Sequence, residues 1–210
     1  MNRLRAPCER RYNSFMIAAA NPRRNITPEE WAALPEDESG ELVDGELVEE
    51  EMPSFVHEVV VIWLGALLRA WAAARGGMVA GSGLKLKVGA RRGRMADLVV
   101  YFRRGKVQAR GIVTVPPDVI VEIVSPDPKD QRRDRIDKHA EYAAFGVKYY
   151  WLVSPDLRTI EILELGADGR YVHAQNLTVG AMSVVGCDGL MIDLDDLWRE
   201  VEHAETEEPD

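Results

Sequence analysis

The stretch PPDVIVEIVSP, residues 116–126, decides the fold because its run of β-branched residues is typical of a strand buried on both faces. Within that run stands one carboxylate, Glu122. A buried carboxylate is costly unless it is paired, hydrogen-bonded or bound to a metal. We therefore expect Glu122 to face a partner that another part of the chain supplies.

The composition fits one globular domain with a real core. The chain has 210 residues, of which 46% are hydrophobic and 29% are charged. Its two cysteines, Cys8 and Cys187, lie far apart and show neither zinc-site spacing nor a disulfide framework, so a reducing cytoplasm is the expected location. The longest apolar stretch, residues 56–74, contains ionisable side chains, so we expect a core helix and no membrane association.

Three segments are expected along the chain. Residues 1–24 are Arg-rich, with an apolar part too short for a signal peptide, and predict a flexible extension. Residues 25–199 predict the folded domain, and residues 200–210 an acidic tail.

Charge is unevenly distributed. The formal net charge of −9 argues against nucleic-acid binding, because that affinity depends on basic groups meeting phosphates. Residues 85–110, however, form a basic belt in which Asp97 is the single acid. We expect the belt to bind DNA through Lys85, Lys87, Arg91, Arg92, Arg94, Arg103, Arg104 and Lys106.

Local patterns predict the order of elements. A capping box at Thr27 starts a short helix, and Asp44-Gly45 predicts a two-residue hairpin turn. Residues 57–75 and 130–145 predict two helices, the second with an apolar inward face that includes Ile136. Strands are expected in LKLKV, MADLVVYF, PPDVIVEIVSP and VKYYWLVSP, followed by a hairpin and a short helical turn near the C-terminus.

This order predicts an α/β (α+β) sandwich in which helices flank a mixed central β-sheet and β-hairpins are added. In such sheets the chemistry lies where the strand ends open a crevice. Asp97 and Glu122, each the lone acid of its strand, would meet there if their strands pair. The two carboxylates and the main-chain carbonyl of Ile123 are the hard ligands that Mg²⁺ or Mn²⁺ prefers. Structural ion pairs with nearby Lys or Arg residues are the alternative.

The sequence resembles a known family from about Thr27 to Trp198. The segments ELVDGEL, ADLVVY, VEIVSP and RRDRIDKHAEYAAFGVKYYWLV resemble the Uma-type family of putative restriction endonucleases, within the PD-(D/E)XK nuclease superfamily. The resemblance implies a restriction-endonuclease-like sandwich and a metal-dependent DNA endonuclease in which Asp97 and Glu122 bind the metal. It also implies a homodimer, in which each subunit cuts one strand.

Two positions depart from the superfamily pattern. Ala96 replaces a proline that only shapes the start of the strand, whereas Val124 stands where the superfamily has a catalytic lysine. Lys138 is the candidate replacement, with Tyr142 one turn later on the same face, and Lys138→Met is expected to abolish cleavage without disturbing folding. The alternative is that Lys138 only pairs with Asp134.

Two further residues are secondary candidates. His57 is a core histidine, an N-terminal helix residue or a member of the site. Glu41 resembles the early acid that some superfamily members add to the metal site. Val124 also leaves open a different function, that of a catalytically inactive nucleic-acid-binding or protein-interaction module that keeps the nuclease fold.

Overall fold

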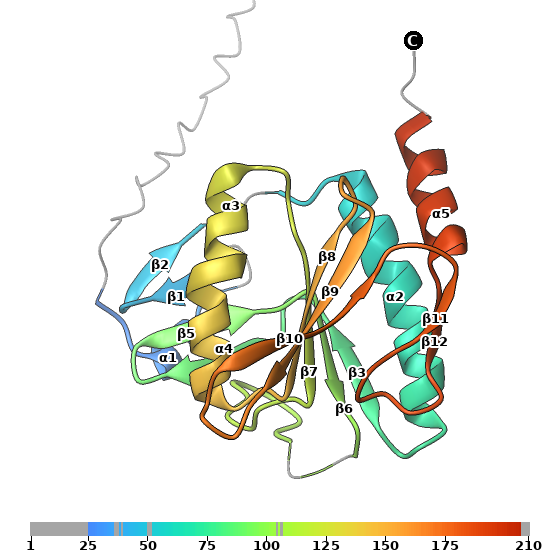
Figure 1. Ribbon diagram of the computed structural model, residues 1–210. Helices are drawn as coiled ribbons and strands as arrows, with labels where there is room; N and C mark the ends of the chain where they lie inside the picture. Colours follow the sequence, from blue (N-terminus) through green and yellow to red (C-terminus); the bar gives the residue numbers. More distant parts are fainter. Residues whose placement is uncertain are drawn as a thin grey trace, which may run out of the picture.

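The computed structural model describes residues 25–35, 38, 40–49, 52–103, 105 and 107–206 (Figure 1). The predicted extension at residues 1–24 lies outside the described residues, as do Arg104 and Lys106 of the basic belt.

A six-stranded mixed sheet forms the centre, in the order β10-β9-β8-β7-β6-β3. Strand β7 runs parallel to β8, and the other neighbouring pairs are antiparallel. Every residue of β7 and β8 is buried, as expected for inner strands covered on both faces. The strands are β3 (Met78–Gly81), β6 (Leu98–Tyr101), β7 (Val119–Ile123), β8 (Tyr149–Ser154), β9 (Thr159–Leu165) and β10 (Tyr171–Leu177).

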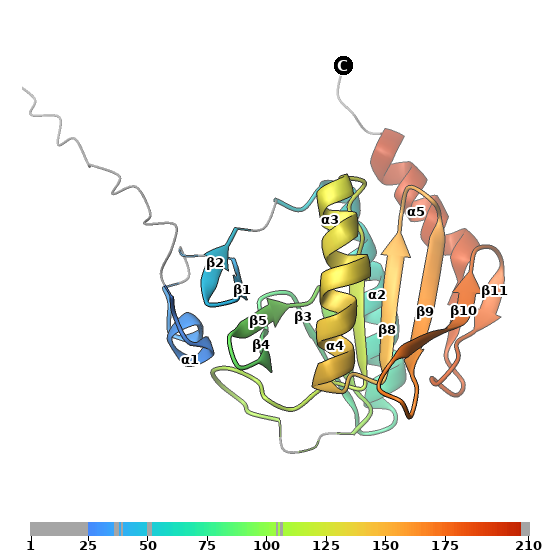
Figure 2. The ribbon, with the colours of Figure 1, turned by 60° about the vertical axis from the view of Figure 1, so that its left-hand side comes forward.

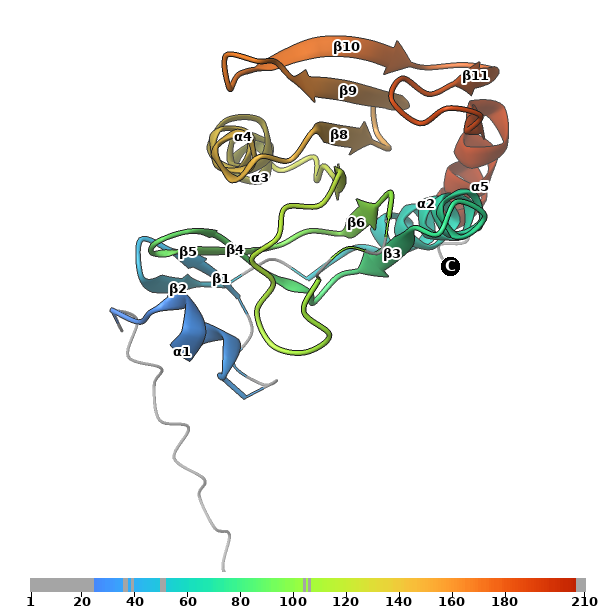
Figure 3. The same cartoon turned by 90° about the horizontal axis from the view of Figure 1, so that it is seen from below.

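Helices cover the two faces of this sheet from opposite sides (Figure 3). One side carries α2 (Phe55–Ala73) and α5 (Leu194–Thr206), and a short hairpin of β11 (Ala181–Ser183) and β12 (Met191–Asp193) precedes α5. The other side carries a continuous helical rod of α3 (Pro128–Arg132), the π-helical turn η1 (Arg133–Lys138) and α4 (His139–Phe145). Each face has its own apolar cluster, so the expected sandwich is confirmed.

A second sheet stands apart from the central one, beside α1 (Figure 2). Its order is β2-β1-β5-β4, and its elements are α1 (Pro28–Ala32), β1 (Glu41–Val43), β2 (Glu46–Val48), β4 (Lys85–Gly89) and β5 (Arg92–Met95). The buried Trp31 ring lies on Gly93 so closely that a Cβ atom there would come within 2.2 Å of the ring. Gly93 is therefore the residue that lets α1 pack on this sheet.

Several local predictions are confirmed, and others need correction. The Thr27 capping box and the Asp44-Gly45 turn are present, the turn with φ values of 52° and 85°. Strands β3 and β5 were not predicted. The segment GARRGR, residues 89–94, looks like a turn and covers most of β5. Helix α5 runs to Thr206, well beyond the short turn that was expected.

The orientation predicted for the helix at residues 130–145 is wrong. Ile136, expected to point inward, is 57% exposed. The buried side of the rod carries Asp130, Asp134, Lys138 and Tyr142 instead. The apolar residues that were expected to face inward therefore lie on the outer side of the rod, and the side that faces the sheet carries charged groups.

Helix α2 is long and apolar enough to cross a membrane by length and composition alone, a test that core helices also pass. Here Val60, Leu64 and Leu68 are buried in the apolar cluster between α2 and the sheet. This packing is that of a core helix.

Candidate active site

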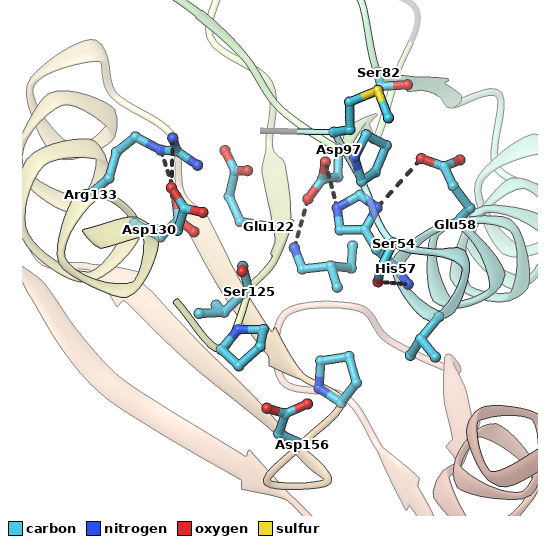
Figure 4. A pocket seen from close by; sticks show the side chains of 18 of the residues that line it. Ser54, His57, Glu58, Ser82, Asp97, Glu122, Ser125, Asp130, Arg133 and Asp156 are labelled. Carbon is cyan, nitrogen blue, oxygen red and sulfur yellow. Dashed lines mark hydrogen bonds and ion pairs between the residues drawn. The ribbon is translucent and has the colours of Figure 1, made fainter. Parts of the chain in front are cut away.

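A pocket of about 560 Å³ opens at one end of the central sheet (Figure 4). Its walls come from the N-terminus of α2, the ends of β6 and β7, and the α3–η1 rod. Asp97, Glu122, His57 and Lys138, all singled out in the sequence, line it together.

The pairing of β6 with β7 brings the two predicted acids together. Leu98 lies opposite Val121 in this antiparallel pair, so the next position along places Asp97 opposite Glu122. The Asp97 carboxylate accepts a hydrogen bond of 2.7 Å from the main-chain N–H of Ile123, the residue that follows Glu122. The two carboxylates are thus held on neighbouring strands.

His57 belongs to the Asp97 side of the pocket. Ser54 caps the start of α2 by accepting a hydrogen bond from the His57 main-chain N–H. The ring Nε2 lies 3.2 Å from Asp97 Oδ1. Burial lowers the pKa of His57, but Asp97 and, to a smaller extent, Glu58 outweigh burial, and the pKa is raised above its ordinary value.

Glu122 is buried and held by two side chains of the helical rod. Lys138 Nζ donates to Glu122 Oε2 over 3.0 Å, and the Tyr142 hydroxyl donates to Oε1 over 2.6 Å. Burial raises the pKa of Glu122 well above its ordinary value, and Lys138 offsets this only in part, since Asp97, Asp134 and Glu41 add repulsion.

Lys138 lies inside a cluster of carboxylates. Besides Glu122, its ammonium is 3.3 Å from Asp134 Oδ1 and 3.6 Å from Glu41 Oε1, and the residue is 2% exposed. Burial alone would lower the pKa of Lys138, but the three carboxylates raise it well above its ordinary value. The predicted pairing with Asp134 and the predicted approach to Glu122 therefore both occur.

Glu41 extends this cluster to the second sheet. It accepts from the buried Arg94 side chain and from the Met95 main-chain N–H, while Arg94 also pairs with Glu141 of α4. Burial raises the pKa of Glu41, but Lys138 and Arg94 together hold it below its ordinary value. Arg94 is 1% exposed and cannot reach a DNA phosphate, so it is removed from the predicted DNA-binding set.

Other residues of the basic belt contact the second sheet and α1. Lys85 donates to the Trp31 carbonyl, Lys87 pairs with Glu29, and Arg92 pairs with Asp44 and Glu141. Arg91 donates to the Asn25 side chain and the Asp44 carbonyl, and Arg103 is exposed. The belt is therefore partly neutralised, and its DNA-binding role stays a prediction for these five residues.

Four further charged residues belong to the site but were not expected there from sequence: Asp130, Arg133, Asp134 and Glu141. The first three line the pocket, and Glu141 holds Arg94 from behind it. Their spacing along KDQRRDRIDKHAEY contains the signal, because acids and bases three or four residues apart share one side of a helix. A charged helical run is more often a solvated face, which is why the signal was missed.

The residues present fit a divalent cation of the Mg²⁺ type. Within the described residues no three His, Cys, Asp or Glu side chains gather closely enough to form a metal site by themselves. Mg²⁺ usually takes one or two carboxylates and completes its shell with water and phosphate oxygens. Asp97 and Glu122 supply such a pair, and their oxygens have lone pairs beyond those used by the contacts described above. The Ile123 carbonyl as a further ligand stays a prediction.

Comparison with known proteins agrees with this architecture. No curated protein matches the chain. A crystal structure described as a putative nuclease belonging to DUF820 from Anabaena variabilis ATCC 29413 superposes with a TM-score of 0.65 at 20% identity. The match covers 84% of this chain and 99% of that one, which shows a shared fold. The sequence model of the Uma2 family, described as "putative restriction endonuclease", matches residues 28–192. The chain therefore belongs to the Uma2 family.

Proposed function

We propose that this protein is a Mg²⁺- or Mn²⁺-dependent endonuclease that hydrolyses phosphodiester bonds of DNA. The observation that carries the proposal is the convergence of Asp97 and Glu122, from two neighbouring strands, on a pocket in which Lys138 lies 3.0 Å from Glu122. Family membership supports the same reaction class.

Asp97 and Glu122 would hold the metal. A metal in such a site lowers the pKa of a bound water and stabilises the oxygens of an in-line displacement at phosphorus. The Ile123 main-chain N–H and His57 orient the Asp97 carboxylate, and Tyr142 and Lys138 orient that of Glu122. Lys138 also places a positive charge next to the metal-binding Glu122, which Val124 cannot do.

A plasmid-nicking assay in Mg²⁺ or Mn²⁺ tests the proposal. We expect Asp97→Asn to lower the nicking rate by roughly 10²- to 10³-fold or more, as the loss of one group that stabilises the transition state does elsewhere. Asp156→Asn is the matched control, because Asp156 lines the same pocket but is exposed. Equal activity in wild type and Asp97→Asn would refute the assignment of the site.

Calorimetric titration with Mn²⁺ tests the metal site separately from activity. We expect the double variant Asp97→Ala, Glu122→Ala to lose the binding that wild type shows. Binding of equal strength in that variant would place the metal elsewhere.

A second candidate is a catalytically inactive module that binds nucleic acid or protein. Val124 favours it, because this side chain is buried in the apolar cluster beneath the rod and occupies the place of the superfamily lysine. Wild-type protein that binds DNA but does not nick it under any metal condition would support this candidate over the nuclease.

The proposal extends to a two-fold dimer, since a dimer would let one active site act on each DNA strand. The proposed location is the cytoplasm, because the cysteines show no disulfide framework. Light scattering of the protein with and without a DNA duplex measures the assembly. A monomer in both conditions would contradict it.

A further inference from the structure

We propose that Arg133 is the substrate-binding residue of this pocket and contacts a phosphate of the strand that enters it. This inference deepens the proposed nuclease function and rests on it. Among the described residues that line the pocket, the only other permanently charged cation is Lys138, which is 2% exposed.

The pocket is strongly acidic for a site that must admit a phosphodiester. Besides Asp97 and Glu122, its walls carry the acids Glu58, Asp130, Asp134, Asp156 and Glu205. Among the lining residues in the described part of the chain, the permanently charged cations are Arg133 and Lys138. Apart from a bound metal ion, the positive charge that attracts phosphate therefore comes from one or both of them.

Lys138 is poorly placed for this task. It is 2% exposed, and three carboxylates surround its ammonium. The Arg133 side chain is 23% exposed and opens to the pocket. Arginine also presents a planar fork of donors that matches phosphate geometry, whereas lysine acts as a point charge.

Two carboxylates of the rod hold the Arg133 guanidinium in position. Its Nη1 atom lies 2.9 Å from Asp130 Oδ1, and its Nε atom lies 3.6 Å from Asp134 Oδ1. Asp130 is 2% exposed, so this carboxylate is an internal support for the guanidinium. Figure 4 shows Arg133 and Asp130 on one side of Glu122, with Asp97 and His57 on the other.

The π-helical turn explains how Arg133 and Lys138 come to line one pocket. In an α-helix of 3.6 residues per turn, residues five apart point about 140° away from each other. Hydrogen bonds from residue i to i+5 widen the turn, so residues five apart lie closer to one side of the helix than they do in an α-helix. The turn η1 begins at Arg133 and ends at Lys138, so it aims both cations into the pocket.

Affinity for a short fluorescein-labelled DNA duplex, measured in the Asp97→Asn background so that no cleavage occurs, tests the inference. We expect Arg133→Gln to weaken binding roughly 10- to 100-fold, as loss of a charge-assisted hydrogen bond does. The slope of log affinity against log salt should fall by about 0.9, the value for one lost phosphate contact. Arg132→Gln is the matched control, because this neighbouring arginine is exposed and does not line the pocket.

Removing Arg133 alone leaves Asp130 buried without this partner, so a second variant guards against misfolding. Asp130→Asn, Arg133→Gln removes both charges together and should fold, as circular dichroism and denaturant unfolding would show, while binding DNA as weakly as Arg133→Gln. Arg133→Lys should recover only part of the affinity, because lysine keeps the charge without the fork.

Equal affinities and salt slopes for Arg133→Gln and Arg132→Gln would overturn the inference, as would absence of duplex binding by Asp97→Asn protein at low salt. Failure of the proposed function gives a different result. In that case wild type does not nick plasmid, yet the loss of affinity in Arg133→Gln still supports a phosphate contact.

Discussion

The two sheets of this protein are held to their surroundings by different forces. The inner strands of the central sheet lie between apolar clusters on both faces. The second sheet also buries Leu42 and Trp31, but its junction with the helical rod includes a buried chain of ion pairs from Arg94 and Glu41 to Glu141 and Lys138. Apolar burial is indifferent to ionisation, whereas a buried ion pair is not. The junction that adjoins the active site is therefore the one whose strength depends on charge.

The largest loss of stability is expected from breaking the charged junction at Arg94. Arg94→Met leaves the buried Glu41 and Glu141 carboxylates without their shared cation and should lower the free energy of unfolding by about 3–5 kcal/mol. Denaturant unfolding at neutral pH measures it. A loss of less than about 1 kcal/mol, typical of exposed ion pairs, would contradict the assigned role of the junction.

A deletion in the apolar cluster gives the contrasting case. Leu64→Ala, in the face of α2 that packs on the central sheet, should cost about 2–5 kcal/mol through lost transfer energy and the cavity left behind. This cost should be nearly the same at neutral and acid pH. A loss of unfolding free energy in Leu64→Ala that depends strongly on pH would contradict the difference proposed between the two sheets.

A smaller loss is expected where the rod meets Glu122. Tyr142→Phe removes the hydroxyl that donates to the buried carboxyl and should cost about 1–3 kcal/mol. Tyr101→Phe is the matched control, since its hydroxyl donates to the neutral main-chain carbonyl of Val115 and should cost about 0.5–1.5 kcal/mol. Denaturant unfolding compares the two, and a larger loss in Tyr101→Phe would contradict the importance of the Glu122 contact.

These contacts alter what is expected of Lys138→Met. From sequence alone this variant should lose cleavage and keep its fold. Because the ammonium neutralises three carboxylates, its removal should also destabilise the protein. Activity of that variant is therefore interpretable only beside its unfolding free energy.

Acid should weaken the charged junction selectively. The folded pKa of Glu41 lies below its ordinary value of 4.5, so the stabilising effect of its charge is complete above 4.5 and is lost as the pH falls through the lower folded value. The difference in unfolding free energy between wild type and Glu41→Gln should therefore shrink in that acid range. A urea-denaturation series from neutral to acid pH measures it, and a constant difference would contradict the lowered pKa.

The smallest effect is expected at Arg103, which is exposed. Arg103→Gln should change the free energy of unfolding by no more than about 0.5 kcal/mol. Together with Arg94→Met it shows whether burial, not residue type, decides the cost of losing a cation. A loss near that of Arg94→Met would contradict this.

Much of the fold was predictable because local signals agree with the tertiary structure. The Thr27 cap, the Asp44-Gly45 turn and the buried run of β7 depend on neighbours in sequence. Strand β5 was missed because GARRGR looks like a turn and a glycine weakens a strand locally. Gly93 is needed because the ring of Trp31, which is distant in sequence, packs directly on it.

The site was predictable where a residue conflicted with its surroundings. Asp97 and Glu122 stood out as lone acids in apolar strands, and the structure places both on one pocket. Arg133 did not stand out, since a charged residue in a charged helix is unremarkable. The position of Arg133 depends on which side of the rod is buried, and the apolar pattern that includes Ile136 predicted the wrong side.

The register between β6 and β7 has a consequence for how such proteins diversify. Neighbouring strands lie about 4.8 Å apart whatever loops connect them. Asp97 and Glu122 therefore keep their separation through any insertion in the connection between β6 and β7, or in the turn before Lys85. Those segments can therefore change and give new substrate preferences without moving the two acids, because strand pairing in the sheet sets the distance between the acids.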